Sequence, residues 1–108
     1  MPAPVEALVE REMPLIWRVG NKMRVLHADL SARDRTLLLL HASAGPMRDD
    51  DLFDSVEYSR LSAFRRDVLR PAHRNRLIEF DERNELVTIS PRGVEHAERL
   101  LRERLAAA

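Results

Sequence analysis

Residues 76–93 read RLIEFDERNELVTISPRG, and this stretch decides the fold that the sequence predicts. Two short apolar runs flank a charged segment of turn-forming residues at 81–85, a pattern typical of a β-hairpin. A two-stranded hairpin is marginal in water by itself. We therefore expect it to lean on helices through its apolar side chains, Leu77, Ile78, Phe80, Leu86, Val87 and Ile89.

Before the hairpin, residues 58–76 read YSRLSAFRRDVLRPAHRNR and predict an Arg-rich helix over 59–70. Ser59 can cap this helix, and Pro71 should end or kink it at Arg70. At about 100° per residue the helix has two faces. The inner face holds Leu61, Phe64 and Val68, and the outer face holds Ser59, Ala63, Arg66 and Arg70, flanked by Arg60, Ser62 and Asp67.

Two further helices are expected upstream. One begins after Ser31, a suitable N-cap, and stops at the Gly45-Pro46 pair. The other is short and begins with the acidic run 49–51, which suits the positive end of the helix dipole. These acids do not predict a metal site, because the Gly and distal Glu of a calcium loop are missing.

Residues 4–30 allow two interpretations. Ile16, Val19, Met23, Leu26 and Leu30 recur at helical spacing and indicate an amphipathic helix with a heptad-like seam. The Gly20-Asn21 pair instead suits a two-residue hairpin loop, although Val19 would then share a face with Lys22, and Trp17 with Arg24. We favour the helix and keep the hairpin as the alternative.

The chain ends in another expected helix, at 91–105, which Ser90 caps and Pro91 begins. Its apolar positions recur at spacings of three or four residues, as on one face of an amphipathic helix. They are Val94, Ala97, Leu101 and Leu105.

Length and composition predict one small globular domain spanning 1–108. The 108 residues are 44% hydrophobic and 33% charged, with a net charge of zero and no cysteine. No secretion signal or membrane-spanning run is recognisable, so we expect a cytoplasmic protein. The chain has no nucleotide-binding loop, no nucleophile motif and no metal-ligand spacing among His27, His41, His73 and His96. It is therefore expected to be no enzyme and to need no cofactor.

The order of helix, short helix, basic helix, hairpin and helix resembles the winged helix-turn-helix domain, and residues 76–93 resemble bacterial regulators of the MarR and PadR type. The resemblance implies a mainly α fold with a small β-hairpin. It divides the chain into a helical extension at 4–30, a core at 31–90 and a C-terminal helix at 91–105. Two features depart from the pattern. Arg76 stands where Gly is usual, so Asn75 could take over the left-handed turn, and the hairpin tip is acidic.

The resemblance also implies binding of double-stranded DNA by a homodimeric transcriptional regulator, with helix 59–70 in the major groove. Arginines would bind guanine or phosphate, and small side chains would allow close approach. The implied DNA-binding residues are Tyr58, Ser59, Arg60, Ser62, Ala63, Arg66, Arg70, Arg74 and Arg83. The implied dimerisation residues are Ile16, Val19, Met23, Leu26, Leu30, Val94, Leu101 and Leu105.

A second hypothesis is a winged-helix interaction module without affinity for DNA. It is motivated by the zero net charge, the acidic hairpin tip and the apolar seam at 16–30. The arginines of 59–70 would then form an ordinary solvated, salt-bridged face. The sequence indicates no particular small-molecule effector under either hypothesis.

Overall fold

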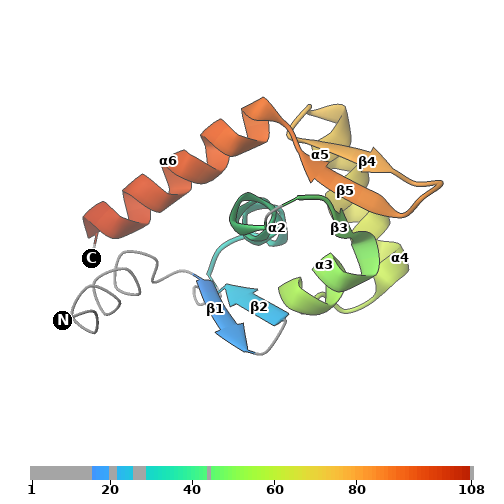
Figure 1. Ribbon diagram of the computed structural model, residues 1–108, viewed down its shortest axis with the longest axis horizontal. Coiled ribbons are helices and arrows are strands. Elements are labelled where there is room, and N and C mark those ends of the chain that lie inside the picture. The colour runs from blue at the N-terminus through green and yellow to red at the C-terminus, as the bar shows by residue number, and fades with distance from the viewer. Residues whose placement is uncertain (1–15, 20–21, 26–28, 44, 108) are drawn as a thin grey trace.

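The computed structural model describes residues 16–19, 22–25, 29–43 and 45–107. Most of them are helical, and a small antiparallel sheet of three strands completes the fold (Figure 1). The expected mixture of helices with a small β structure is therefore confirmed. The structure adds a second, two-stranded sheet near the start of the described chain.

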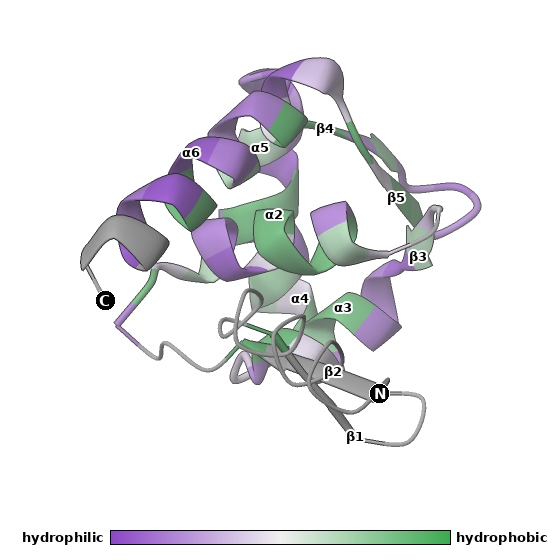
Figure 2. Ribbon diagram, turned by 60° about the vertical axis from the view of Figure 1, so that its left-hand side comes forward, coloured by the Kyte–Doolittle hydropathy of each residue, from purple (hydrophilic) through white to green (hydrophobic). Residues whose placement is uncertain are grey.

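Helix α2, Ala32–Ala42, lies at the centre of the fold, with α6 on one side and α3 on another (Figures 1 and 2). Its four consecutive leucines, 37–40, are all buried, so neighbouring elements cover this helix on several sides. The hydroxyl of Ser31 accepts a hydrogen bond from the backbone N–H of Asp34 at 3.1 Å, which confirms the expected N-cap. The helix ends at Ala42, shortly before Gly45-Pro46, as predicted.

The expected hairpin is formed by β4, Ile78–Asp81, and β5, Leu86–Ile89. A third strand, β3 at Met47–Arg48, pairs with β5 to give the order β3-β5-β4. Sequence reasoning missed β3 because two residues are too few to show an alternating pattern. Strand β3 pairs with part of the free edge of β5, so the hairpin is not an isolated two-stranded sheet.

Alternate side chains of the sheet face the core, as a period of two requires. Ile78, Phe80 and Val87 are buried, while the side chains between them are exposed. The expectation that Leu86 anchors the hairpin is wrong, because Leu86 is an exposed large apolar residue. Its neighbour Val87 points inward instead, since adjacent strand residues face opposite ways.

The short helix α3, Asp49–Val56, begins with the acidic run as predicted and buries Leu52 and Val56. The next helical stretch runs from 61 to 74 without interruption as α4, Leu61–Phe64, the π-helical turn η1, Arg65–Leu69, and α5, Arg70–Arg74. We call the whole stretch helix 61–74. Ser59 is not its cap, because the N-cap position falls on Arg60 and no side chain caps it.

Pro71 does not end helix 61–74, contrary to prediction. A proline lacks the N–H that would continue the regular ladder. The turn before it is widened, and the N–H of Arg70 donates to the carbonyl of Arg65, five residues back. In a π-helical turn the backbone N–H bonds to the carbonyl five residues back instead of four. The helix accommodates Pro71 in this way and continues to Arg74.

The turn between α5 and β4 also differs from expectation. Arg76 itself adopts a left-handed conformation, with a φ of 62°, whereas Asn75 has a φ of −85°. The left-handed position therefore did not move to Asn75. The arrangement is held by two backbone hydrogen bonds, from Arg76 N–H to the carbonyl of His73 and from Leu77 N–H to that of Ala72, each at 3.0 Å.

The favoured helix at the N-terminal end is wrong over 16–19 and 22–25, where the structure has the antiparallel strands β1, Ile16–Val19, and β2, Lys22–Val25. The register pairs Ile16 with Val25, Trp17 with Arg24 and Val19 with Lys22. Ile16 and Val25 are partly buried against the core, which accounts for the preference for strands despite mixed partners elsewhere. Residues 29–30 are not helical either, and the rest of the expected helix, at 4–15, 20–21 and 26–28, lies outside the described residues.

Helix α6, Pro91–Ala107, confirms the predicted C-terminal helix and packs on α2. The Ser90 hydroxyl accepts from the N–H of Gly93 at 3.2 Å, which is the expected cap, and donates to the carbonyl of Arg76. A Cβ at Gly93 would lie 2.1 Å from the Leu77 carbonyl oxygen. Glycine is thus required here for the close approach of α6 to the start of β4.

Candidate nucleic-acid interface

Helix 61–74 is fixed by the side chains of its inner face. Phe64, Val68, Leu69 and Ala72 are buried in the core. The ring of Phe64 also packs against the rings of Phe53 and Tyr58, with centroids 6.2 and 5.6 Å apart. Such tilted aromatic pairs add to the burial itself, so the N-terminal half of the helix is firmly attached to α3.

A buried ion pair joins helix 61–74 to the start of α3. The Nε of Arg65 donates to a carboxylate oxygen of Asp49 at 2.6 Å, and the Asp49 side chain is only 1% exposed. This hydrogen bond raises the pKa of Arg65. The backbone N–H of Asp49 donates in turn to the carbonyl of Glu85. Helix 61–74, α3 and the β4–β5 hairpin therefore meet at Asp49.

The outer face of helix 61–74 carries exposed polar side chains at a spacing of four residues. They are Ser62, Arg66 and Arg70. Arg66 lies beside Asp67, with Nε and Nη2 donating to the two carboxylate oxygens at 2.8 and 3.0 Å. This hydrogen-bonded pairing lowers the pKa of Asp67 and raises that of Arg66. The face is cationic only in part, because a carboxylate accompanies the arginine.

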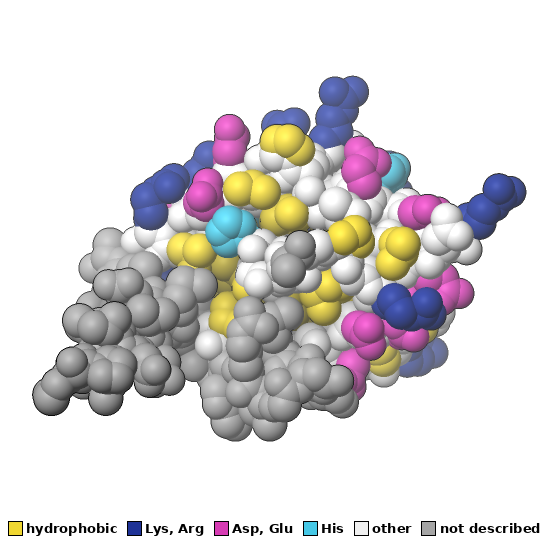
Figure 3. All heavy atoms as spheres, in the orientation of Figure 1, with side chains coloured by type: hydrophobic (Ala, Val, Ile, Leu, Met, Phe, Trp, Pro, Cys, Tyr) yellow, Lys and Arg dark blue, Asp and Glu magenta, His cyan; other side chains and the backbone are white. Residues whose placement is uncertain are grey.

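The tip of the hairpin folds back toward the same helix. Arg70 Nε and Nη2 donate to one oxygen of Glu82, at 3.2 and 2.8 Å. The hydrogen bond from Arg70 lowers the pKa of Glu82. Acidic and basic side chains lie next to one another at this end of the molecule (Figure 3). The expected phosphate-binding arginine is thus engaged by the hairpin itself.

The rest of the tip is organised by short-range hydrogen bonds. Asp81 accepts from the backbone N–H and the side-chain amide of Asn84, at 3.2 and 2.8 Å, and the side-chain bond lowers the pKa of Asp81. Glu85 has a φ of 57° and accepts from Arg48 at 2.8 Å. Arg83 is exposed between these residues, and no described residue forms an ion pair with it.

Most of the predicted DNA-binding residues lie on the surface. Those that are exposed are Ser59, Arg60, Ser62, Arg66, Arg70, Arg74 and Arg83. Ala63 is only 7% exposed, so its expected place on the outer face is wrong. It lies one position before Phe64, close enough to the inner face for the neighbouring elements to cover its small side chain. Tyr58 is half-buried by its packing on Phe64.

Six of the eight predicted dimerisation residues can be placed in the structure, and they fall into three groups. Ile16, Val19 and Met23 lie in the β1–β2 hairpin, and a helical seam through them is therefore excluded. Leu30 is 6% exposed and belongs to the core of its own chain. Val94 and Leu101 are half-buried, and Leu101 packs against the core. Leu26 and the side chain of Leu105 lie outside the described residues.

Sequence reasoning missed the two acidic residues that hold helix 61–74 to its neighbours. Asp49 pairs with Arg65, and Glu82 pairs with Arg70. Sequence reasoning also missed a hollow lined by Arg33, Arg92 and Arg99, which are far apart along the chain. The spacing of Arg92, His96 and Arg99 on the expected C-terminal helix was the one available signal, since it places them on one face.

Comparison with known proteins yields no match: no protein-family model, no curated protein and no solved structure matches this chain. None of the helices that the structure describes is long and apolar enough to cross a membrane. Within the same described residues, no three His, Asp or Glu side chains gather closely enough to hold a metal ion. The surface around helix 61–74 must therefore be interpreted from its own chemistry.

Proposed function

We propose that this protein is a winged helix-turn-helix protein that binds double-stranded DNA sequence-specifically, as a homodimeric transcriptional regulator similar to those of the MarR and PadR type. Support comes from the order of elements. Helix α2, α3 and helix 61–74 precede the β4–β5 hairpin, and β3 adds a third strand to it. In a helix-turn-helix protein the second helix enters the major groove, and helix 61–74, which follows α3, would be that helix here.

The observation that carries the proposal is the exposed outer face of helix 61–74 beside the hairpin. Ser62 and Arg66 lie in the first half of the helix, the half that meets base edges in this class of protein. Arg60 and Ser59 are exposed just before it. An arginine can donate two hydrogen bonds to guanine and distinguish it by about 1–3 kcal/mol from another base.

Arginines farther along the chain would bind phosphates. Arg70 and Arg74 follow on the same helix, and Arg83 lies at the hairpin tip. The pairs Arg66–Asp67 and Arg70–Glu82 are exposed, and exposed ion pairs contribute little stability because solvent screens them. A phosphate can therefore replace a carboxylate as the partner. The displaced carboxylates stay nearby, however, and should keep the affinity lower than the number of arginines suggests.

We also propose that the DNA-binding form is a homodimer. One recognition helix reads only a few base pairs, and proteins of this class bind two half-sites about 34 Å apart. The β1–β2 hairpin replaces the expected helical seam, so α6 is the remaining candidate among the predicted dimerisation elements. Its partly buried Leu100 and Leu101 are the apolar residues that a partner could cover further.

The test is selection of duplexes from a random library, followed by fluorescence anisotropy titration of the selected duplex at several salt concentrations. Contacts to several phosphates predict that the logarithm of the affinity falls linearly with the logarithm of the salt concentration, by roughly 0.9 for each phosphate. Failure to enrich any sequence at low salt would contradict the proposal.

A second candidate function is a winged-helix interaction module without affinity for DNA. The specific observation in its favour is that Glu82 and Asp67 already occupy the arginines of the outer face. Salt separates the two functions, because docking through apolar surface responds weakly to salt whereas phosphate contacts respond steeply. A partner that remains bound as salt is raised would favour the interaction module.

A further inference from the structure

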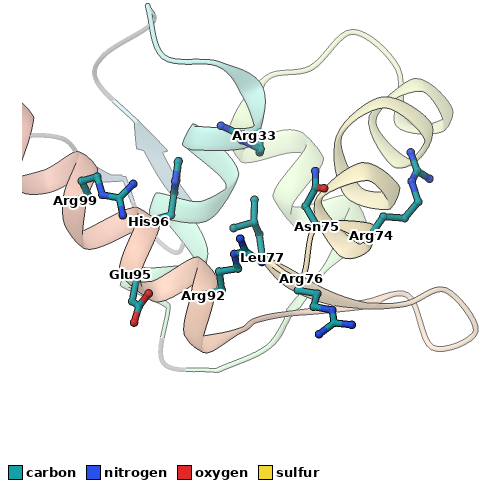
Figure 4. Close-up of a pocket in the computed structure, with 9 residues that line it drawn as sticks. All are labelled: Arg33, Arg74, Asn75, Arg76, Leu77, Arg92, Glu95, His96 and Arg99. Atoms are coloured by element: carbon teal, nitrogen blue, oxygen red, sulfur yellow. The ribbon is translucent and has the colours of Figure 1, made fainter.

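A hollow of about 550 Å³ lies beyond the C-terminal end of helix 61–74, away from the residues assigned to base contacts. Three segments enclose it: the first turn of α2, the turn between α5 and β4, and the first half of α6 (Figure 4). Its volume falls within the range of small-molecule sites in proteins, about 300–1,000 Å³. The hollow is lined by Arg33, Arg74, Asn75, Arg76, Leu77, Arg92, Glu95, His96 and Arg99.

Basic side chains converge in this hollow. Arg92, His96 and Arg99 recur at spacings of four and three residues and so lie on one face of α6. Figure 4 shows these three side chains directed into the hollow, with Arg33 of α2 opposite them. The other charged lining residues, Glu95, Arg74 and Arg76, point away from its centre in the same view.

The arginines of the hollow differ from others that meet a neighbouring element. Arg65 pairs with Asp49, Arg70 with Glu82, and Arg104 with Asp29. Among the described residues, by contrast, no hydrogen-bonded or ion-paired partner faces the guanidinium groups of Arg92 and Arg99. Like charges held together repel one another, and an anion between them would relieve that repulsion.

Besides Glu95, the carboxylate of Asp34 lies beside the hollow, and it already has a hydrogen-bonded partner. Oδ1 of Asp34 accepts a hydrogen bond from Nε2 of His96 at 2.9 Å. The same oxygen, Oδ1, lies 3.4 Å from Arg33, a distance that makes only a weak contact. Asp34 thus orients His96, while Arg33, Arg92 and Arg99 retain unused donors.

The walls of the hollow are fixed by backbone contacts. The left-handed turn at Arg76 is bonded through its carbonyl to the Ser90 hydroxyl. Ser90 N–H donates to the carbonyl of Leu77 at 3.1 Å, and Gly93 lies directly against that carbonyl. The start of α6 therefore cannot shift relative to the α5–β4 turn without breaking these contacts. A fixed site loses little conformational freedom when a ligand binds.

We propose that this hollow binds a small anion carrying phosphate or several carboxylate groups, held by Arg33, Arg92 and Arg99. The planar guanidinium groups suit either oxyanion, because each can donate two parallel hydrogen bonds. The lining is mostly polar, with Leu77 its one apolar side chain, so the hollow suits a polar ligand better than an apolar one. The site involves residues of α2 and α6 that take no part in the proposed DNA contacts.

The test is an NMR titration of the full chain with inorganic pyrophosphate and, separately, with citrate at constant ionic strength. We expect saturable shifts confined to the backbone amides of 92–99 and 74–77 and to the Nε–Hε signals of Arg33, Arg92 and Arg99. Saturation by pyrophosphate alone assigns a phosphate ligand, and saturation by citrate alone assigns a polycarboxylate. No saturation by either probe at millimolar concentration would overturn the proposal.

Two matched variants on α6 separate a site from general attraction of anions. Arg99→Gln removes a donor in the hollow, whereas Arg102→Gln removes the same charge from an exposed position outside it. Arg99→Gln should weaken binding of the effective probe about tenfold, as expected for one charged hydrogen bond. Arg102→Gln should change it less than about twofold, since exposed charges are screened by salt. Equal weakening by both variants would overturn the proposal.

Two further measurements complete the test. The double variant Arg92→Gln/Arg99→Gln should abolish saturable binding, and its amide spectrum shows whether it remains folded; retained binding by the folded variant contradicts the site. Addition of a short DNA duplex should leave the signals of 92–99 unshifted. Duplex that shifts these signals and displaces the probe would assign the hollow to nucleic-acid phosphates and overturn the small-ligand proposal.

Discussion

Arg70 on helix 61–74 donates two hydrogen bonds to Glu82 at the hairpin tip. The pair ties the two elements of the proposed DNA interface together, and it also places a carboxylate where a phosphate would lie. Glu82→Gln should therefore strengthen binding to duplex DNA roughly threefold to tenfold, because it removes one repulsive charge and releases Arg70. Fluorescence anisotropy at fixed salt measures the change. Glu98→Gln, the same charge change at an exposed position on α6, should have little effect.

The same pair predicts a pH dependence of stability. Its hydrogen bond makes the pKa of Glu82 lower in the folded protein than in the unfolded chain. The pair therefore contributes stability above the unfolded-state pKa, and this contribution is lost as pH falls through the folded-state value. An NMR titration of the Glu82 side chain should show a depressed pKa that returns toward the ordinary glutamate value in Arg70→Gln. An unchanged pKa in that variant would contradict the pairing.

Asp49 and Arg65 predict a strong energetic coupling in the interior. Arg65→Ala leaves the buried Asp49 carboxylate without its partner and should lower the free energy of unfolding by about 3 kcal/mol. With Asp49→Ala it completes a double-mutant cycle, for which we expect a coupling energy of about 1–3 kcal/mol. Denaturant unfolding measures the free energy of unfolding of the wild type, of both single variants and of the double variant. The exposed pair Arg48 and Asp50 is the control, and its coupling should be much smaller because solvent screens it.

The close approach at Gly93 predicts a position-specific effect of adding one methyl group. Gly93→Ala would place a Cβ 2.1 Å from the carbonyl oxygen of Leu77, and the start of α6 would have to move. We expect a loss of about 2 kcal/mol in unfolding free energy, typical of overpacking. Gly45→Ala is the matched control, because nothing lies within 4 Å of its Cβ position. Similar melting temperatures of the two variants would be inconsistent with this packing.

The left-handed turn predicts opposite effects at adjacent positions. Arg76→Gly replaces a residue that is strained at positive φ with one that adopts this conformation freely. The substitution should raise the unfolding free energy by about 1 kcal/mol. Asn75→Gly only adds freedom to the unfolded chain and should lower it by roughly 0.5 kcal/mol. Thermal unfolding of both variants tests the assignment of the turn. Stabilisation by the Asn75 substitution instead would place the left-handed residue at 75.

Local signals in the sequence were enough for the parts of the fold whose determinants are adjacent in the chain. Alternating apolar residues, the turn-forming segment and the Ser-Pro helix start predicted the β4–β5 hairpin and α6. The prediction of a helix in the N-terminal segment failed because Ile16, Val19 and Met23 suit a helical face as well as strands. The choice depended on how Ile16 and Val25 pack against the core, and that packing is not visible in local periodicity.

The candidate interface was predictable only as a set of residue types. The exposed arginines of helix 61–74 and the neighbouring Asp67 were identified. Glu82 was not, because it lies twelve residues from its partner Arg70. Ala63 was misplaced because a spacing of 100° per residue gives no account of how far neighbouring elements extend around a helix. The hollow requires α2 and α6 to meet, and such a contact follows from the tertiary fold alone.

The most direct test of the central proposal is the affinity of the charge-reversed double variant Arg66→Glu/Arg70→Glu for a selected duplex. Arg33→Glu/Arg92→Glu, which makes the same change in net charge at exposed positions away from Leu100 and Leu101, is the control for general electrostatics. With fluorescence anisotropy at near-physiological salt, the first variant should lose at least about a hundredfold in affinity, since two contacts become repulsive. The control should lose far less. Specific binding that survives Arg66→Glu/Arg70→Glu in the folded protein would contradict the assignment of helix 61–74 to DNA.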